Sequence, residues 1–375
     1  MRPRAFLVAA VSGLALAVAG VLPAGAVSDR ARMPELSFAG ESTLAAGMTF
    51  EGTVVGGLSS ITYDEARDVY YAISDARPEI GQGAHRFYTL DIDVSDGSLD
   101  PGDVTVLDVT TFLQSDGTPF PGGSLDPEGL TLTAQDTLVM TSEGFATTGV
   151  PPRVLEFTLD GRLVAEVDLP AYVDPAPGVG VQQNLGIESA AVTRNGRFLF
   201  TGFENALAQD GPAATTANGS LARIQRIDAR TGDVEREYVY ETDPVAEAPV
   251  PAGSFTVNGL VELLPLNSQF MITMERSFSV GAGNTVRLYR AALPGATDVL
   301  GTADLDDVSK LRTAGKTLVI DLDVLGLTLD NLEGMTLGPR LPNGDRALII
   351  VSDNNFTPGQ VSQFLLFSAS KVGGR

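Results

Sequence analysis

The sequence predicts an all-β protein, a β-propeller of four-stranded blades, and three observations support this class. A short pattern returns five times. It consists of one residue followed by a small residue such as Gly, then an apolar strand, and then a second strand that ends on a carboxylate. The copies start at residues 56, 128, 188, 258 and 333, so their spacings are 72, 60, 70 and 75 residues. The chain also has 41 Gly and 22 Pro, which suit many short strands joined by turns. Strand-built repeats of this length are typical of radial arrays of small sheets.

The strands of each blade are predicted from apolar runs bounded by turn residues. The second copy contains Leu130–Thr133, Thr137–Thr141, Arg153–Thr158 and Arg162–Val167, with a turn at Asp160-Gly161. The third contains Ala190–Thr193, Arg197–Gly202, Arg223–Ile227 and Val234–Tyr240, with turns at Asn195-Gly196 and Thr231-Gly232. The fourth contains Leu260–Leu264, Phe270–Thr273, Val286–Ala291 and Thr317–Leu322.

Five copies predict five blades, with six as the alternative. A sixth blade would have to come from Ala291–Gly315, where Thr297–Leu300 is a candidate strand and Asp304–Leu311 a candidate short helix. The fifth copy ends at Gln363–Phe367 and lacks an outer strand, which Glu35–Ser42 can supply. An N-terminal strand in the last blade would close the ring and remove exposed sheet edges.

The N-terminal residues have the pattern of an export signal. Arg2 and Arg4 precede the apolar run Ala5–Leu22, and Ala24-Gly25-Ala26 is a small-x-small cleavage site. A transmembrane anchor is the alternative, although Ser12, Gly13 and Gly20 interrupt the run. We therefore expect a signal peptide at 1–26, a lead-in with the closing strand at 27–53, and one propeller domain at 54–370. The mature protein is expected to be secreted or periplasmic, without a membrane span.

Composition excludes several kinds of partner and site. Lys and Arg number 25 against 47 Asp and Glu, a net charge of −22, which argues against nucleic acid because binding phosphates needs clustered cations. The chain has no Cys and a single His, His85, so disulfides, thiolate metal sites and His-rich metal sites are excluded. Any bound metal must be held by oxygen ligands. We expect a monomer.

The repeat also predicts an acidic site. In an antiparallel hairpin the start of the first strand and the end of the second lie together. The first strands start with Gly56, Glu128, Glu188, Asn258 and Glu333, and the second strands end with Asp75, Glu143, Glu204, Glu275 and Asp353. All the carboxylates of these two sets are predicted metal ligands around one mouth of the central channel. Oxygen ligands favour Ca²⁺, with Mg²⁺ as the alternative.

A second set of recurring residues starts the third strands at the same end. Arg86, Arg153, Arg223 and Arg287 occupy these positions, and the fifth blade has Gln363. Guanidinium groups around an acidic, cation-bearing centre can bind a phosphate or carboxylate. The alternative is a structural ion pair in every blade. Residues that break the repeat are further candidates for the site: Arg276, Asn354-Asn355, Asn184 and Asn331.

Three motifs carry a resemblance to a known family: Asp126-Pro127-Glu128-Gly129, Asp330-Asn331-Leu332-Glu333-Gly334-Met335 and Val351-Ser352-Asp353-Asn354-Asn355-Phe356. Together with Gly57-Leu58-Ser59 and Arg153-Val154-Leu155-Glu156-Phe157, they resemble the phytase-like family, also called "esterase-like activity of phytase" proteins. The resemblance covers roughly Val54 to Phe367. It implies an exported β-propeller hydrolase related to calcium-dependent propeller phytases. The Asp-Asp-Pro-Ala motif of those phytases does not occur here.

The first hypothesis is a calcium-dependent hydrolase of phosphate esters that acts on a small anionic substrate. Its predicted catalytic residues are Glu333, Glu128 and His85. Its predicted substrate-binding residues are Arg86, Arg153, Arg223, Arg276, Arg287 and Asn354. The alternatives are an extracellular binding or scaffold propeller with structural calcium, and a metal-assisted lactonase or carboxylesterase.

Overall fold

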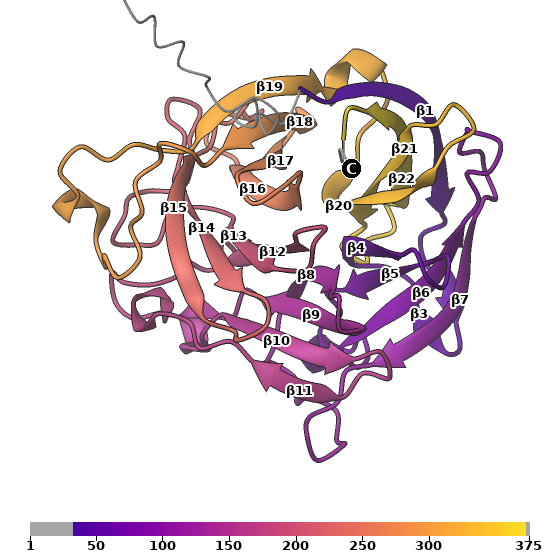
Figure 1. The fold of residues 1–375 in the computed structure, drawn as a ribbon, viewed down its shortest axis with the longest axis horizontal. Coiled ribbons are helices and arrows are strands. Elements are labelled where there is room, and N and C mark those ends of the chain that lie inside the picture. The colour runs from indigo at the N-terminus through magenta and orange to yellow at the C-terminus, as the bar shows by residue number, and fades with distance from the viewer. Residues whose placement is uncertain (1–32, 373–375) are drawn as a thin grey trace, which may run out of the picture. The chain divides into compact units, whose positions relative to one another are not determined.

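The computed structural model describes residues 33–372 and shows four-stranded antiparallel sheets set around one axis (Figure 1). Five such sheets form the blades, and the prediction of an all-β, five-bladed propeller is confirmed. The inner strands β4, β8, β12, β16 and β20 contact one another around the axis. The expected signal peptide and its cleavage site lie outside the described residues.

The first two blades follow the predicted strand order. Blade 1 consists of β4 (Leu58–Asp64), β5 (Val69–Ser74), β6 (Arg86–Ile92) and β7 (Val104–Thr111). Blade 2 consists of β8 (Pro127–Leu132), β9 (Thr137–Ser142), β10 (Arg153–Thr158) and β11 (Leu163–Glu166). A two-stranded hairpin, β2 (Thr49–Phe50) with β3 (Thr53–Val54), precedes blade 1.

The next two blades repeat this order, and the first three strands of blade 4 are each 10 residues long. Blade 3 consists of β12 (Ile187–Val192), β13 (Phe198–Phe203), β14 (Leu221–Asp228) and β15 (Val234–Glu241). Blade 4 consists of β16 (Thr256–Pro265), β17 (Phe270–Ser279), β18 (Gly283–Ala292) and β19 (Gly315–Asp321). The hairpin turn predicted at Asp160-Gly161 is present in blade 2, between β10 and β11. Gly161 has a φ of 82°, and a Cβ there would lie 2.2 Å from the carbonyl oxygen of Thr111.

Blade 5 is built from both ends of the described chain. Its strands β20 (Asn331–Arg340), β21 (Arg346–Asp353) and β22 (Ser362–Ser370) are completed by β1 (Glu35–Leu44), which pairs antiparallel with β22. Figure 1 shows β1 as the outer strand beside β22. The predicted closure of the ring by an N-terminal strand is therefore confirmed, and blade 5 has four strands like the other blades.

Hydrophobic side chains fill the spaces between neighbouring blades. One cluster joins blades 1 and 2 through Tyr71, Phe87, Leu130, Leu138 and Phe157, all at most 5% exposed. Comparable clusters lie between each other neighbouring pair, including blades 5 and 1. Because the inner two strands of each blade are buried on both faces, they need apolar or small residues at nearly every position, which explains the continuous apolar runs of the repeat.

The segment between β18 and β19 does not form a sixth blade. Thr297–Leu300 contains no strand, and the only helical turn of the expected Asp304–Leu311 helix is the 3-10 turn Leu305–Asp307. The segment instead bonds to the outer strand of blade 3, from Val299 N to Glu237 O and from Ala314 N to Val239 O. The other 3-10 turns are Pro78–Ile80, Ala146–Thr148, Ala171–Val173 and Leu322–Leu325. None of the helical elements in residues 33–372 has the length and apolarity needed to cross a membrane.

Candidate active site

The first strand of every blade contains a β-bulge near its start. One extra residue interrupts the pairing with the second strand in each case, and these residues are Ser59, Glu128, Glu188, Val261 and Glu333. On the second strand, the residue that follows the partner of the pre-bulge residue is Asp75, Glu143, Glu204, Arg276 or Asp353 in blades 1 to 5. Asp75, Glu143 and Glu204 follow the last paired residue, whereas Arg276 and Asp353 are still paired, with Gly259 and Asn331. Bulges redirect side chains at strand ends. The two sets therefore meet at one mouth of the channel.

The register corrects the predicted positions in two blades. In blade 1, Leu58 pairs with Ser74, so the bulge residue is Ser59 and not Gly56. In blade 4, Leu260 pairs with Glu275, so the mouth positions belong to Val261 and Arg276, not to Asn258 and Glu275. In blade 4 the position at the mouth therefore lies three residues after the predicted one on the first strand, at Val261 instead of Asn258, and one residue after it on the second, at Arg276 instead of Glu275.

Glu275 is therefore held away from the other carboxylates. It accepts hydrogen bonds from Tyr240 Oη at 2.7 Å and Asp243 N at 2.8 Å. Its Oε1 also pairs with Lys316 Nζ at 2.6 Å. These contacts use the carboxylate inside blade 4 and its neighbouring loop. We accordingly revise the metal-ligand prediction for Glu275 to a structural role.

Eight carboxylates form what we call the acidic mouth: Asp75, Asp126, Glu128, Glu143, Glu188, Glu204, Glu333 and Asp353. Burial, followed by the charges of neighbouring carboxylates, raises the pKa of Glu128 and Asp353 well above their ordinary values. Burial also raises the pKa of Asp75 and Glu204 to about 7. Like charges gathered in a buried site disfavour one another's ionised form, so the mouth favours a cation.

Three members of the acidic mouth come close enough to share one ion. Asp126, Glu128 and Glu143 each place one carboxylate oxygen so that all three lie within 4.8 Å of one another. Asp126 immediately precedes β8, and its carbonyl accepts from Glu143 N at 3.0 Å. Asp126 was not among the predicted ligands, although its Asp-Pro-Glu-Gly motif stood out in the sequence. Three carboxylates without nitrogen or sulfur donors fit a hard cation such as Ca²⁺ or Mg²⁺.

Arg276 is the one cation that replaces an acid in the ring. Its Nη2 donates to Glu333 Oε1 at 2.8 Å and lies 3.6 Å from Glu204 Oε1, and its side chain is 11% exposed. Burial opposes its charge, while Glu333, Glu204 and Glu188 favour it and raise its pKa. Within residues 33–372, Arg276 Nε, Glu204 Oε1 and Asp75 Oδ1 are buried without a hydrogen-bond partner. These atoms remain able to bind a ligand at the mouth.

Asparagines of the last blade support the mouth. Asn331 donates from Nδ2 to Glu333 Oε1 at 2.8 Å and to Asp353 Oδ2 at 3.4 Å. Asn354 Oδ1 accepts from Gly57 N and Phe356 N, each at 3.0 Å, and so joins the last blade to the first. This use of its side-chain oxygen gives Asn354 a structural task beside the predicted substrate-binding one.

The four recurring arginines do not join the acidic mouth. Arg153 pairs with Glu166 at 2.7 Å, Arg287 with Asp321 at 2.8 Å, and Arg223 with Asp210 at 2.6 Å and Glu237 at 2.5 Å. The start of the third strand faces the end of the fourth, so these cations meet outer acids as cross-strand or loop pairs.

Arg86 has a different set of structural partners. Its guanidinium donates to Tyr88 Oη at 2.7 Å and to the carbonyls of Gln82, Ala84 and Val54 at 2.8–3.0 Å. The expectation that Arg153, Arg223 and Arg287 clamp a substrate is therefore corrected, because the third strand lies farther from the axis than the second and these arginines pair with outer acids. The guanidinium of Arg86 is likewise occupied by Tyr88 and backbone carbonyls, although its charge opposes the rise in the pKa of Asp75 at the mouth.

His85 is buried rather than presented to a substrate. It is 1% exposed, and its Nδ1 lies 3.0 Å from the carbonyl oxygen of Ala76. Burial lowers the pKa of its imidazole, which keeps the ring neutral. This environment does not favour the predicted acid–base role of His85.

Comparison with known proteins adds a family and a set of distant folds. A phytase-like profile, described as "Esterase-like activity of phytase", matches residues 53–356. A comparison with curated proteins gave no match. Solved structures similar to the chain include a DUF4221 family member from Bacteroides vulgatus (8% identity, 91% of this chain and 99% of that chain, TM-score 0.40). Others are a putative 6-phosphogluconolactonase from Bacteroides uniformis (13%, 81% and 80%, 0.32) and the Dos1 propeller (8%, 86% and 70%, 0.37). These structural similarities are too weak to carry a functional argument.

Proposed function

The chain belongs to the phytase-like family, and from this membership and the acidic mouth we propose that it is a metal-dependent hydrolase of ester bonds. Phosphate esters are the first proposed substrates and Ca²⁺ the proposed metal. The observation that supports this most is the group Asp126, Glu128 and Glu143, whose oxygens lie within 4.8 Å of one another. The buried Arg276 lies near other carboxylates of the same mouth, Glu204 and Glu333. The proposed substrate is therefore a small anion.

Asp126, Glu128 and Glu143 would hold the cation. When bound, it would polarise the ester and lower the pKa of an attacking water. Glu143 is already oriented, because its Oε2 accepts from Gly186 N at 2.9 Å. Orientation by such a neighbour is typical of metal-binding carboxylates.

Arg276 and Glu204 are the proposed partners of the substrate. Arg276 is fixed by Glu333, and its Nε remains available to donate to an anionic oxygen. Glu204 Oε1 also has no hydrogen-bond partner in the described chain, and its pKa of about 7 suits a general base near neutral pH. Glu333 would then act by positioning Arg276, which refines its predicted catalytic role.

A carboxylic ester is the second candidate substrate. The family description names an esterase-like activity. Among the predicted substrate-binding arginines, Arg276 alone forms an ion pair with carboxylates of the acidic mouth in the described residues. Phosphate groups usually take more than one cationic partner. A lactone or aryl ester needs only one oxyanion stabiliser, so Arg276 alone would suffice.

Turnover of 4-nitrophenyl phosphate and 4-nitrophenyl acetate, with Ca²⁺ and with EDTA, tests the proposal. The protein should be taken from the exported fraction, where an N-terminus near residue 27 would support the proposed signal peptide. We expect turnover of one ester that EDTA abolishes and Ca²⁺ restores. Arg276→Gln should lower kcat/KM by about a hundredfold or more, the loss typical of an oxyanion-stabilising donor.

Arg153→Gln is the matched control, because Arg153 pairs with Glu166 away from the mouth. It should leave kcat/KM within about twofold. The absence of metal-dependent turnover on both esters would reject the hydrolase and favour a binding propeller with structural calcium. Equal losses in both variants would reject the assigned role of Arg276.

A further inference from the structure

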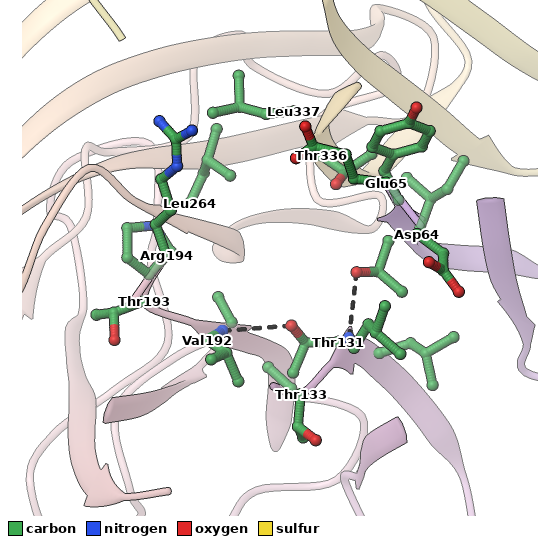
Figure 2. Close-up of a pocket in the computed structure, with 18 of the residues that line it drawn as sticks. Asp64, Glu65, Thr131, Thr133, Val192, Thr193, Arg194, Leu264, Thr336 and Leu337 are labelled. Carbon is green, nitrogen blue, oxygen red and sulfur yellow. Dashed lines mark hydrogen bonds between the residues drawn. The ribbon is translucent and has the colours of Figure 1, made fainter. Parts of the chain in front are cut away.

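A large cavity lies at the other mouth of the central channel, away from the acidic mouth. It is a funnel of about 860 Å³, formed by the ends of the inner strands and the turns that follow them. Figure 2 shows Asp64, Thr131, Val192, Leu264 and Leu337 around it. A cavity of this size can hold a drug-sized molecule.

The wall of the funnel is partly polar and partly apolar. Thr62 Oγ1 accepts from Leu132 N at 3.2 Å. Thr131 Oγ1 accepts from Val192 N at 3.3 Å, as a dashed line in Figure 2 shows. These bonds satisfy the inner edges of β8 and β12. The side formed by blades 4 and 5 is apolar, with Leu263, Leu264, Pro265, Leu266, Met335 and Leu337.

Glu262 lies at the inner end of the funnel. It is 2% exposed, and its carboxyl group accepts from Ser60 Oγ at 2.9 Å and from Leu263 N at 2.8 Å. Burial raises its pKa to about 8, so it is mostly neutral at pH 7. The inner end of the funnel therefore does not attract cations as the acidic mouth does.

The charges at the rim are distributed unequally. On one side of the rim the charge of Arg67 is neutralised, because its guanidinium donates to Asp64 at 2.7 Å and to Asp136 at 2.5–2.6 Å. Arg346 has a weaker partner: Glu65 lies 3.9 Å away and is 76% exposed, whereas the Arg346 side chain is 14% exposed.

Other cations surround Arg346. Burial lowers the pKa of its guanidinium; Glu65 opposes this effect, and Arg194 and Arg340 add to it. Its Nε is buried without a hydrogen-bond partner among residues 33–372. Arg194 lines the same funnel. Arg346 therefore has little counter-charge of its own and lies beside an apolar wall.

We propose that the funnel is a second binding site, for an amphipathic monoanion such as a medium-chain carboxylate. The carboxylate would bind Arg346 and Arg194, and the alkyl chain would pack against Leu264 and Met335. A guanidinium with little counter-charge gains a charge-assisted hydrogen bond from such a ligand. Burial of the ligand's alkyl chain against the apolar wall adds favourable hydrophobic free energy. The site does not depend on the proposed hydrolase activity.

Calorimetric titration of the full protein with sodium octanoate tests this inference. We expect one saturable site, affinity at least about a hundredfold higher than for acetate because the alkyl chain is buried, and no binding of octylammonium. Arg346→Gln and Arg194→Gln should each weaken octanoate binding at least about tenfold. Arg276→Gln, at the opposite mouth, should not change it.

Arg312→Gln is the control for charge, because it removes an exposed arginine that bonds Gly295 O outside the funnel. It should keep the octanoate affinity within about threefold. The melting temperature of each variant checks that it is folded. If Arg346→Gln does not fold, Arg346→Lys replaces it, because lysine keeps the charge but not the forked donors of the guanidinium. Lack of saturable octanoate binding, equal affinity for acetate, or unchanged affinity in folded Arg346 and Arg194 variants would overturn the proposal.

Discussion

The acidic mouth and the third-strand arginines are both repeated from blade to blade, yet only one of them gathers around the axis. The carboxylates lie on the inner two strands and interact across blades, as Glu333 does with Asp75 and Glu188. The arginines lie one strand farther out and pair within their own sheet or its loops. A repeated residue forms a shared site only when its strand is close enough to the axis for equivalent copies to meet.

Blade 4 adds a second lesson to this comparison. The other blades have an acid at the mouth end of the second strand, whereas blade 4 has Arg276 at the equivalent position and Val261 at the bulge. A ring of equal groups has no preferred direction, and this substitution supplies one. The charge of Arg276 lies near Glu204 and Glu333, while the metal-sized group Asp126, Glu128 and Glu143 belongs to the start of blade 2 and the loop before it.

The largest expected effect concerns an outer arginine. Arg223 is fully buried with Asp210 and Glu237. Arg223→Ala leaves two buried carboxylates without their cation, so the free energy of unfolding should fall by about 3–5 kcal/mol in a urea titration. Activity per folded molecule should not change. Arg153→Ala is the control at the equivalent position, and its partly exposed pair should contribute only about 0–1 kcal/mol.

A folded Arg223→Ala variant with unchanged stability but a raised KM would contradict this prediction. The outer arginines would then have to be counted among the substrate-binding residues. Similar losses of stability in both variants would instead show that burial does not separate the two pairs.

The second prediction concerns the pH dependence of the metal-free protein. The folded-state pKa of Glu204 is raised to about 7, above its ordinary value of 4.5. Between these values the unfolded state binds fewer protons than the fold, so the free energy of unfolding decreases as pH rises. The loss for Glu204 alone is on the order of 3 kcal/mol. Melting in EDTA should show a lower Tm at pH 8 than at pH 5.

Adding Ca²⁺ makes this test more specific to the acidic mouth, because a cation bound there offsets the repulsion among ionised carboxylates. The increase in Tm on adding Ca²⁺ should be larger at pH 8 than at pH 5. The outer pair behaves in the opposite sense: Arg153 lowers the pKa of Glu166, so its contribution is lost as pH falls. A metal-free Tm that rises from pH 5 to pH 8 would contradict a mouth of raised pKa values.

Most of the fold could be predicted from the sequence. Five copies of one pattern predict five blades, and turns such as Asp160-Gly161 mark hairpins because glycine accepts positive φ. The missing outer strand in the fifth copy indicated that the N-terminal segment closes the ring, as β1 does. Each of these signals is local, or follows from counting strands per repeat.

The site was only partly predictable, because register is not visible in the repeat. Asn258-Gly259-Leu260 resembles Glu128-Gly129-Leu130, yet the bulge of blade 4 falls at Val261. Side-chain pairing is equally hidden: nothing in the sequence links Arg223 to Asp210 across the loop that follows β13. No sequence motif marks Glu262, the residue after the bulge of blade 4, although the structure places it in the wall of the funnel. Asp126 did have a signal, since it precedes Pro127 where a strand and an acid begin.

The smallest expected effect separates Glu275 from the acidic mouth. Glu275→Gln keeps a hydrogen-bond acceptor for Tyr240 but removes the charge that pairs with Lys316. The free energy of unfolding should fall by about 1 kcal/mol, while calcium affinity and the pH dependence of Tm stay as in the parent protein. Glu204→Gln is the matched variant at the mouth and should flatten that pH dependence. A tenfold loss of calcium affinity in Glu275→Gln would place Glu275 among the ligands, and the bulge register would then no longer define the site.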